Sequence, residues 1–167
     1  MPRAALIAAL LVVVAVHALL LWIYHVPEAK SLWGDEISYA RVAVALSEGR
    51  AAELDLLWPP LYPHFVGRLL RLGGGSLVPV QLAQLALLVG IALLARDIWR
   101  RLVDQGPGGD WVALAFLAYP PLVAYTHYLW PEILHLALLM LALWILVARR
   151  ARTAWLALLA WCWVSRC

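Results

Sequence analysis

Two acidic residues stand beside long apolar segments of the chain, where they favour chemistry at a membrane surface. Asp35 follows the first apolar segment, and Glu132 opens a later one directly after Pro131. A carboxylate can act as a general base that takes the proton of an acceptor hydroxyl group, and an ionisable group at the edge of a crossing indicates a functional site. Two carboxylates can also share a divalent cation, because hard cations take oxygen ligands. We predict a catalytic base at Asp35, a second functional acid at Glu132, and a divalent metal ion shared by the two.

Both acids also have a structural interpretation, which the sequence leaves open. Asp35 could cap the helix that follows it by accepting a backbone N–H. Glu132 could lie in the first turn of its helix, where a negative charge interacts favourably with the helix dipole. A catalytic and a structural role can coexist in one residue.

Three arginines are the cations closest to the membrane interface on the same predicted side, namely Arg41, Arg68 and Arg71. A guanidinium group binds phosphate through two parallel hydrogen bonds when it is well placed. We predict that these arginines bind the phosphate of a lipid-linked donor. For Arg68 and Arg71 the alternative is that their side chains extend along apolar surface to lipid headgroups in general.

Aromatic and histidine side chains complete the set of candidates. Tyr39, Tyr62 and His64 are predicted to line a substrate channel, with ordinary packing as the alternative for the two tyrosines. The spacing of His64, His127 and His135 matches no metal motif. We therefore interpret these three histidines as polar residues that face the interior of a helix bundle.

The composition identifies the surroundings of these candidates. Of the 167 residues, 65% are hydrophobic and 14% are charged, whereas a soluble domain contains about a quarter charged residues. The lipid bilayer is therefore a predicted partner. The net charge of +3 is scattered along the chain, so we expect no nucleic-acid partner. Cys162 and Cys167 fit neither a disulfide framework nor a zinc motif.

Long apolar segments predict an all-α, polytopic helical membrane protein that forms a single membrane domain. A helix needs about 20 apolar residues to cross the hydrocarbon core. We predict about four full crossings, and a truncated fifth that would reach only about 16 Å. In chain order these segments are 4–24, 77–95, 111–129, 133–148 and 154–164. The first is longer than a secretory signal and lacks an A-x-A-like cleavage site, so we interpret it as an uncleaved signal anchor.

Residues 25–76 are predicted to form an external loop that carries two interfacial helices. The first is a short amphipathic stretch after Asp35. The second begins near Pro63 and has its two arginines on the face opposite its apolar residues. The triplet Gly73-Gly74-Gly75 is expected to end it.

Charge selects the topology of this loop. If residues 59–72 crossed the membrane instead, the six arginines that follow the second and fourth crossings would all lie outside the cell (Arg96, Arg100, Arg101, Arg149, Arg150 and Arg152). The positive-inside rule opposes that arrangement. We therefore predict a multi-pass protein of the cell (inner) membrane with a cytoplasmic N-terminus, and Asp35 and Glu132 on the extracytoplasmic face.

The motifs around these acids resemble those of a known family. After the anchor segment, Gly34-Asp35-Glu36-x-x-Tyr39 and later Pro59-Pro60-Leu61-Tyr62-Pro63 are similar to the C-type (GT-C) glycosyltransferase superfamily. The most similar members are the bacterial relatives of the dolichyl-phosphate-mannose protein mannosyltransferases and of lipid A aminoarabinose transferase. The segment from Tyr119-Pro120-Pro121 to Thr126, and then Trp130-Pro131-Glu132, resembles their third and fourth crossings. The resemblance covers nearly the whole chain as scattered motifs.

The resemblance implies a membrane glycosyltransferase that moves a sugar from a polyprenyl-phosphate donor to an acceptor protein, lipid or glycan. It implies that Asp35 is the catalytic base or a metal-linked residue and that Glu36 is the neighbouring acid of the site. Glu132 matches a second-loop acid, although many relatives have Asp there. Members of the superfamily have many more crossings, so we expect this chain to be an N-terminal part that is inactive alone.

Two other functions stay open at this stage. A non-catalytic membrane scaffold or assembly subunit is the main alternative, and it predicts no special role for Asp35. A transporter fragment is the other. Transporters place broken helices and polar groups near the middle of the membrane, whereas in this sequence only Pro120-Pro121 interrupts a crossing.

Overall fold

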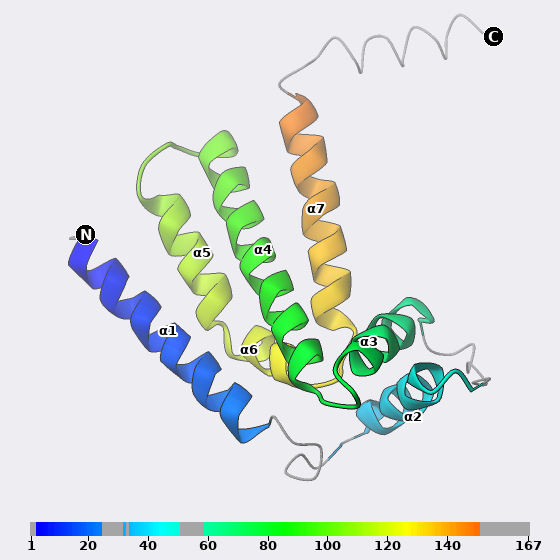
Figure 1. Cartoon of the computed structure of the whole chain (residues 1–167). Coiled ribbons are helices and arrows are strands. Elements are labelled where there is room, and N and C mark those ends of the chain that lie inside the picture. Colours follow the sequence, from blue (N-terminus) through cyan, green and yellow to red (C-terminus); the bar gives the residue numbers. More distant parts are fainter. Residues whose placement is uncertain (1–2, 25–31, 33, 51–58, 151–167) are drawn as a thin grey trace, which may run out of the picture.

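The computed structural model describes residues 3–24, 32, 34–50 and 59–150. In this part of the chain there are seven helices and no strand, which confirms the all-α prediction (Figure 1). The helices are α1 (Arg3–Ile23), α2 (Asp35–Ser47), α3 (Leu61–Leu72), α4 (Val78–Leu102), α5 (Gly108–Ala118), α6 (Pro120–His127) and α7 (Glu132–Arg150). The predicted fifth segment, 154–164, lies outside the described residues.

Two of these helices are long and apolar enough to cross a membrane. They are α1, over Ala4–Ile23, and α4, which continues past its predicted end at residue 95 to Leu102. A third span is obtained only if α6 and α7 are counted together, and these two helices are bent by 117° at the break between them. Helices suited to a membrane are therefore present, but four full crossings are not confirmed.

The predicted crossing 111–129 is not one continuous helix. It is split into α5 and α6 at Tyr119, whose φ of −68° and ψ of 116° are extended. The residue before a proline is forced away from the α conformation by the proline ring, and Pro120 then opens α6 in the position where its missing N–H does no harm. The Pro120-Pro121 pair therefore ends one helix and starts another.

The long helices stand side by side, and the short ones gather at one end of them. Figure 1 shows α4 between α5 and α7, with α1 beside α5 and α6. Helices α2 and α3 pack against each other across the end where α4 and α7 begin. The connection from α4 to α5 lies at the opposite end. We call the first the α2–α3 end and the second the α4–α5 end.

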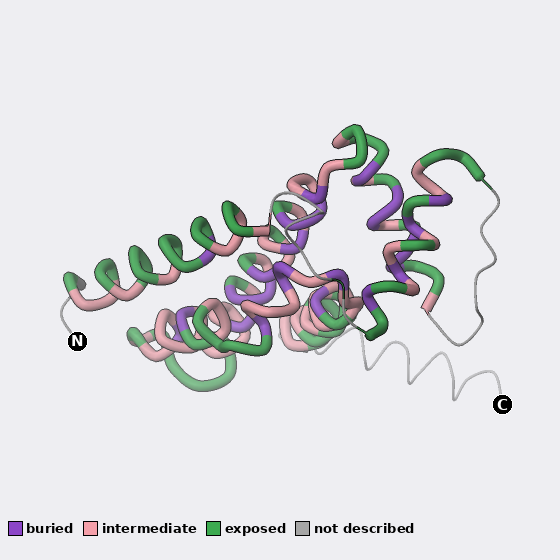
Figure 2. Tube along the Cα trace, turned by 90° about the horizontal axis from the view of Figure 1, so that it is seen from below, coloured by how far each residue is buried: buried purple, intermediate pink, exposed green. Residues whose placement is uncertain are grey.

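The buried side chains form two clusters, one at each level of the bundle. At the α2–α3 end the cluster is Tyr39, Ala43, Tyr62, Val66, Leu70, Leu77, Val80 and Leu129. Within the bundle, α4, α6 and α7 meet through Leu88, Ile91, Leu122 and Ile133. Figure 2 shows that α1 is exposed along most of its length. Its apolar side chains are therefore available to lipid rather than to a protein core.

A glycine allows α2 and α3 to approach closely. A Cβ atom added to Gly67 would lie 2.9 Å from the carbonyl oxygen of Ala43 and 3.1 Å from the Cβ of Leu46. Helix α3 then ends as the glycine triplet predicts, with Gly73 as its C-cap and with positive φ angles at Gly74 and Gly75. This turn separates α3 from α4, so Leu61–Leu72 form their own short helix at the end of the bundle.

Candidate functional site

Asp35 and Glu132 are the first residues of two helices whose starts lie at the α2–α3 end. Both side chains are exposed. The N-cap of α2 is Gly34, and no side chain caps this helix. The interpretation of Asp35 as the capping residue is therefore wrong. The Asp35 carboxylate lies in the first turn of α2, where the helix dipole favours a negative charge. This interaction leaves the carboxylate oxygens available to other partners.

The electrostatics of two tyrosines show that the acids of α2 and α7 lie around the same place. Burial, and then the charges of Glu132 and Asp35, raise the pKa of Tyr39. Burial, followed by the charges of Glu36 and Glu132, raises the pKa of Tyr62 well above its ordinary value. The two rings meet edge to face, with their centroids 5.2 Å apart. The structure thus brings together five predicted site residues: Asp35, Glu36, Tyr39, Tyr62 and Glu132.

Tyr39 and Tyr62 are buried in the protein interior next to this site, and they do not line an open channel. Their exposed fractions are 2% and 1%, and both belong to the hydrophobic cluster of the α2–α3 end. The packing interpretation of these residues is the one that the structure shows.

Glu36 is buried and joins α2 to the turn before α7. Its exposed fraction is 0%, and its Oε1 accepts the backbone N–H of Leu129 at 2.5 Å. A buried carboxylate is tolerated when hydrogen bonds satisfy it. Glu36 therefore holds in place the segment that carries Glu132, and its role in the geometry is that of a positioning residue.

The Gln84 side chain, on α4, joins α3 to the end of α6 near the two acids. The Tyr62 hydroxyl donates to Gln84 Oε1 at 2.6 Å, and Gln84 Nε2 donates to the carbonyl oxygens of Thr126 (2.8 Å) and Tyr128 (3.0 Å). These bonds link α3, α4 and the end of α6. Gln84 was not among the predicted site residues. A glutamine within a long apolar helix is nevertheless a signal of a functional or structural contact, because polar groups inside a crossing are expensive unless paired.

The histidines divide into buried and exposed ones. His127 is buried in the bundle as predicted, and its Nε2 lies 3.0 Å from Nδ1 of His17 on α1. His17 was not singled out from the sequence. The bundle-facing prediction is wrong for His64 and His135, which are both exposed.

The predicted phosphate-binding arginines do not join the acids in the described part of the chain. Arg41 is exposed on α2, and Arg68 and Arg71 are exposed on α3. His64, Arg68 and Arg71 follow the spacing i, i+4 and i+7 along α3, which places these three side chains on one face of the helix. Tyr62, Val66 and Leu70 occupy the buried face of the same helix.

At the opposite, α4–α5 end the charged side chains pair with one another. Asp110 on α5 accepts from Arg96 Nε at 2.5 Å and from Arg100 Nη2 at 3.3 Å. Asp97 accepts from Arg101 Nε and from Trp144 Nε1, each at 2.6 Å. The α4–α5 end therefore holds its arginines and aspartates in ion pairs, whereas Asp35 and Glu132 are exposed at the α2–α3 end.

The residues at the α2–α3 end can be tested for their fit to a metal ion. Among the described residues there is no group of three or more His, Cys, Asp or Glu side chains that could hold one. A pair of carboxylates fits Mg²⁺ only as a partial ligand set, since this ion keeps water and takes phosphate oxygens beside one or two carboxylates.

Comparison of the chain with protein-family models, with curated proteins and with solved structures gives no match. Two exposed carboxylates from separate helices, supported by a rigid hydrogen-bonded base, can accept a proton or bind a cation at one end of a membrane bundle.

Proposed function

We propose that this chain contributes the catalytic carboxylates of a membrane glycosyltransferase that uses a polyprenyl-phosphate sugar as donor. The observation that supports this best is the convergence of Asp35 and Glu132, each exposed in the first turn of its helix, around the buried Tyr39–Tyr62 pair. The two residues are 97 positions apart (132 − 35), so it is the fold that brings both charges within electrostatic reach of Tyr39. The resemblance of the surrounding motifs to the GT-C superfamily agrees with this function.

The reaction needs one proton acceptor and one leaving group. The Asp35 carboxylate takes the proton of the acceptor hydroxyl as its oxygen forms a bond to the anomeric carbon of the sugar. The bond between that carbon and the phosphate oxygen breaks, and the polyprenyl phosphate leaves with the electron pair. General bases of this kind contribute about 10² to 10⁴-fold to a rate.

The remaining predicted residues have supporting roles in this proposal. Arg41, Arg68 and Arg71 attract the donor phosphate to the α2–α3 end by charge. A divalent cation, if Asp35 and Glu132 share one, would neutralise negative charge on that phosphate. Glu36 and Gln84 hold Asp35 and Glu132 in their relative positions through hydrogen bonds to the segment before α7.

The proposed topology places the site on the extracytoplasmic face of the cell membrane. The arginines of the α4–α5 end would then lie at the cytoplasmic surface, as the positive-inside rule favours. Cysteine labelling tests this directly. A cysteine at position 35 should react with a membrane-impermeant maleimide in intact cells, and one at position 104 should react only after the membrane is opened. The reverse pattern would contradict the topology and the function together.

Activity is tested by two measurements on membranes that contain the chain. A photoreactive polyprenyl-phosphate analogue should label the wild-type chain, and the label should decrease in a double variant of Arg68→Gln and Arg71→Gln. In a full-length glycosyltransferase that includes this segment, transfer of radiolabelled sugar from polyprenyl-phosphate hexoses and pentoses should decrease at least 100-fold in Asp35→Asn. Asp104→Asn, at the opposite end, is the matched control and should leave transfer unchanged.

The scaffold alternative makes the opposite prediction for the same variants. If the chain is a non-catalytic assembly subunit, Asp35→Asn will leave both labelling and transfer at the wild-type level. Labelling that is absent in the wild-type chain would also contradict the glycosyltransferase proposal.

A further inference from the structure

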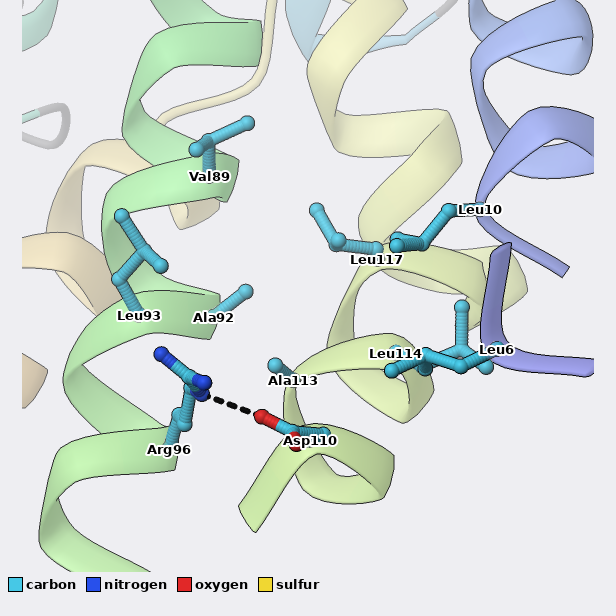
Figure 3. Close-up of a pocket in the computed structure, with 10 residues that line it drawn as sticks. All are labelled: Leu6, Leu10, Val89, Ala92, Leu93, Arg96, Asp110, Ala113, Leu114 and Leu117. Atoms are coloured by element: carbon cyan, nitrogen blue, oxygen red, sulfur yellow. Dashed lines mark hydrogen bonds and ion pairs between the residues drawn. The ribbon is translucent and has the colours of Figure 1, made fainter. Parts of the chain in front are cut away.

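A cavity of about 270 Å³ lies between α1, α4 and α5 at the α4–α5 end. Its walls are apolar side chains from all three helices, and Figure 3 shows Leu6 and Leu10 of α1 facing Leu114 and Leu117 of α5. The two polar residues of the lining are Arg96 and Asp110, which point toward each other at one end of the cavity. The cavity therefore has a long apolar part and a charged end.

The charged end has a positive excess. One carboxylate, that of Asp110, accepts from two guanidinium groups, those of Arg96 and Arg100. The Arg100 Nε is buried, and within the described part of the chain it has no hydrogen-bond partner. A guanidinium group has five N–H donors in a fixed fork. Arg100 does not line the cavity, but it is joined through Asp110 to Arg96, which does.

This arrangement fits an anionic phospholipid. We infer that the cavity between α1, α4 and α5 binds an acyl chain of one such lipid and that Arg96 binds its phosphate, with Arg100 adding positive charge through its pairing with Asp110. A basic pocket between helices on the cytoplasmic side is a known kind of site for anionic headgroups. The inference depends on the membrane placement of α1 and α4 but not on the proposed transferase activity.

A lipid bound in this cavity would also affect how firmly α1 is attached to the other helices. Only 6% of the apolar window of α1 is buried inside the protein, and α1 touches the bundle mainly along α5 and α6. A lipid chain between α1 and α4 would fill space that no side chain fills. The bound lipid would therefore strengthen the attachment of α1.

The test is native mass spectrometry of the full chain in a neutral detergent, titrated with phosphatidylglycerol or with phosphatidylcholine of the same acyl chains. Each arginine near an anionic lipid surface is worth about 1 kcal/mol, which corresponds to about fivefold in affinity. We expect at least this preference for phosphatidylglycerol. Equal retention of the two lipids would overturn the inference.

Four variants separate a lipid site from an ordinary ion pair. Arg96→Gln should reduce the preference about fivefold, and Arg96→Lys should retain it. Asp110→Asn should increase phosphatidylglycerol binding, because it removes the only negative charge of the cavity lining. Ala113→Phe should reduce retention of both lipids by occupying the apolar part. If Arg96→Gln and Asp110→Asn weaken binding equally, or if Ala113→Phe has no effect, the site is not a lipid site.

The source of the phosphate is distinguished in the same titration. Glycerol 3-phosphate at millimolar concentration should not displace phosphatidylglycerol, because it lacks the acyl chain that fills the cavity. Displacement would show that a free phosphate suffices, and it would contradict the lipid assignment.

Discussion

The two ends of the bundle use polar side chains in different ways. At the α2–α3 end the polar groups beneath the acids are buried, and each is hydrogen-bonded to a distant segment, as Glu36 is to Leu129 and Gln84 to Thr126. At the α4–α5 end they form ion pairs near the surface. In the pair of Asp97 with Arg101, both side chains are 40% exposed. The first kind of contact fixes a geometry, and the second mainly supplies charge.

This difference has an energetic basis. A buried polar group that loses its partner costs about 1 to 3 kcal/mol, because it has neither water nor protein to bond with. An exposed ion pair is worth about 0.2 to 1 kcal/mol, since water competes for both partners. The α2–α3 end should therefore respond sharply to substitutions that the α4–α5 end tolerates.

The largest loss of stability is expected for Gln84→Leu at the α2–α3 end. It leaves the Tyr62 hydroxyl and the carbonyl oxygens of Thr126 and Tyr128 without the Gln84 side chain, at a cost of about 3 kcal/mol. Unfolding by SDS in mixed micelles, followed by tryptophan fluorescence, measures it. Gln105→Leu is the control, because exposed Gln105 makes one bond, to the Arg100 carbonyl oxygen. Equal losses for the two variants would contradict the comparison.

A smaller effect is expected where α2 crosses α3. Gly67→Ala places a Cβ 2.9 Å from the carbonyl oxygen of Ala43, and the resulting separation of the helices should destabilise the fold by about 2 kcal/mol. Gly90→Ala is the matched control within α4, where an added Cβ meets nothing within 4 Å. It should stabilise the fold by about 0.5 to 1 kcal/mol through helix propensity. If both variants changed the stability in the same direction in the unfolding assay, the close approach of α2 and α3 would not be what requires glycine at position 67.

Sequence patterns predicted the elements better than their connections. The apolar runs identify α1 and α4, and the glycine triplet after α3 identifies its end, because both are properties of neighbouring residues. The proline pair predicted an interruption near residue 120, and the structure shows two helices there. The number of crossings does not follow from apolar length alone, because α5 and α6 are each too short to be counted as spans.

The candidate site was predictable in its acids but not in its support. Asp35 and Glu132 carry local signals, since each stands at the start of a helix beside glycine or proline. The roles of Glu36 and Gln84 depend on partners 93 and 42 residues away. No local pattern specifies such a partner, because the pairing arises only when separate helices pack. Local sequence alone therefore does not distinguish Glu36 from its neighbour Asp35, the proposed catalytic base.

The pH dependence of stability tests the burial of Tyr62. Its raised pKa means that, above an ordinary tyrosine pKa of about 10, the unfolded chain releases the phenolic proton while the folded chain keeps it. Stability should therefore fall as pH rises above about 10, by up to about 1.4 kcal/mol per pH unit for this group. Tyr62→Phe should make this fall shallower in the unfolding assay. An unchanged slope would mean that Tyr62 ionises without unfolding.

The smallest effect is expected for Asp97→Asn, which examines the α4–α5 end. The variant loses the charge paired with Arg101 but keeps an oxygen that can accept from Trp144 Nε1. Because the Asp97–Arg101 pair is partly exposed, the loss should be about 0.5 kcal/mol. This loss of stability should be smaller still in 1 M salt, where charges are screened within about 3 Å. A loss as large as that of Gln84→Leu, and insensitive to salt, would mean that the α4–α5 end fixes geometry as firmly as the α2–α3 end, and the distinction between the two ends would fail.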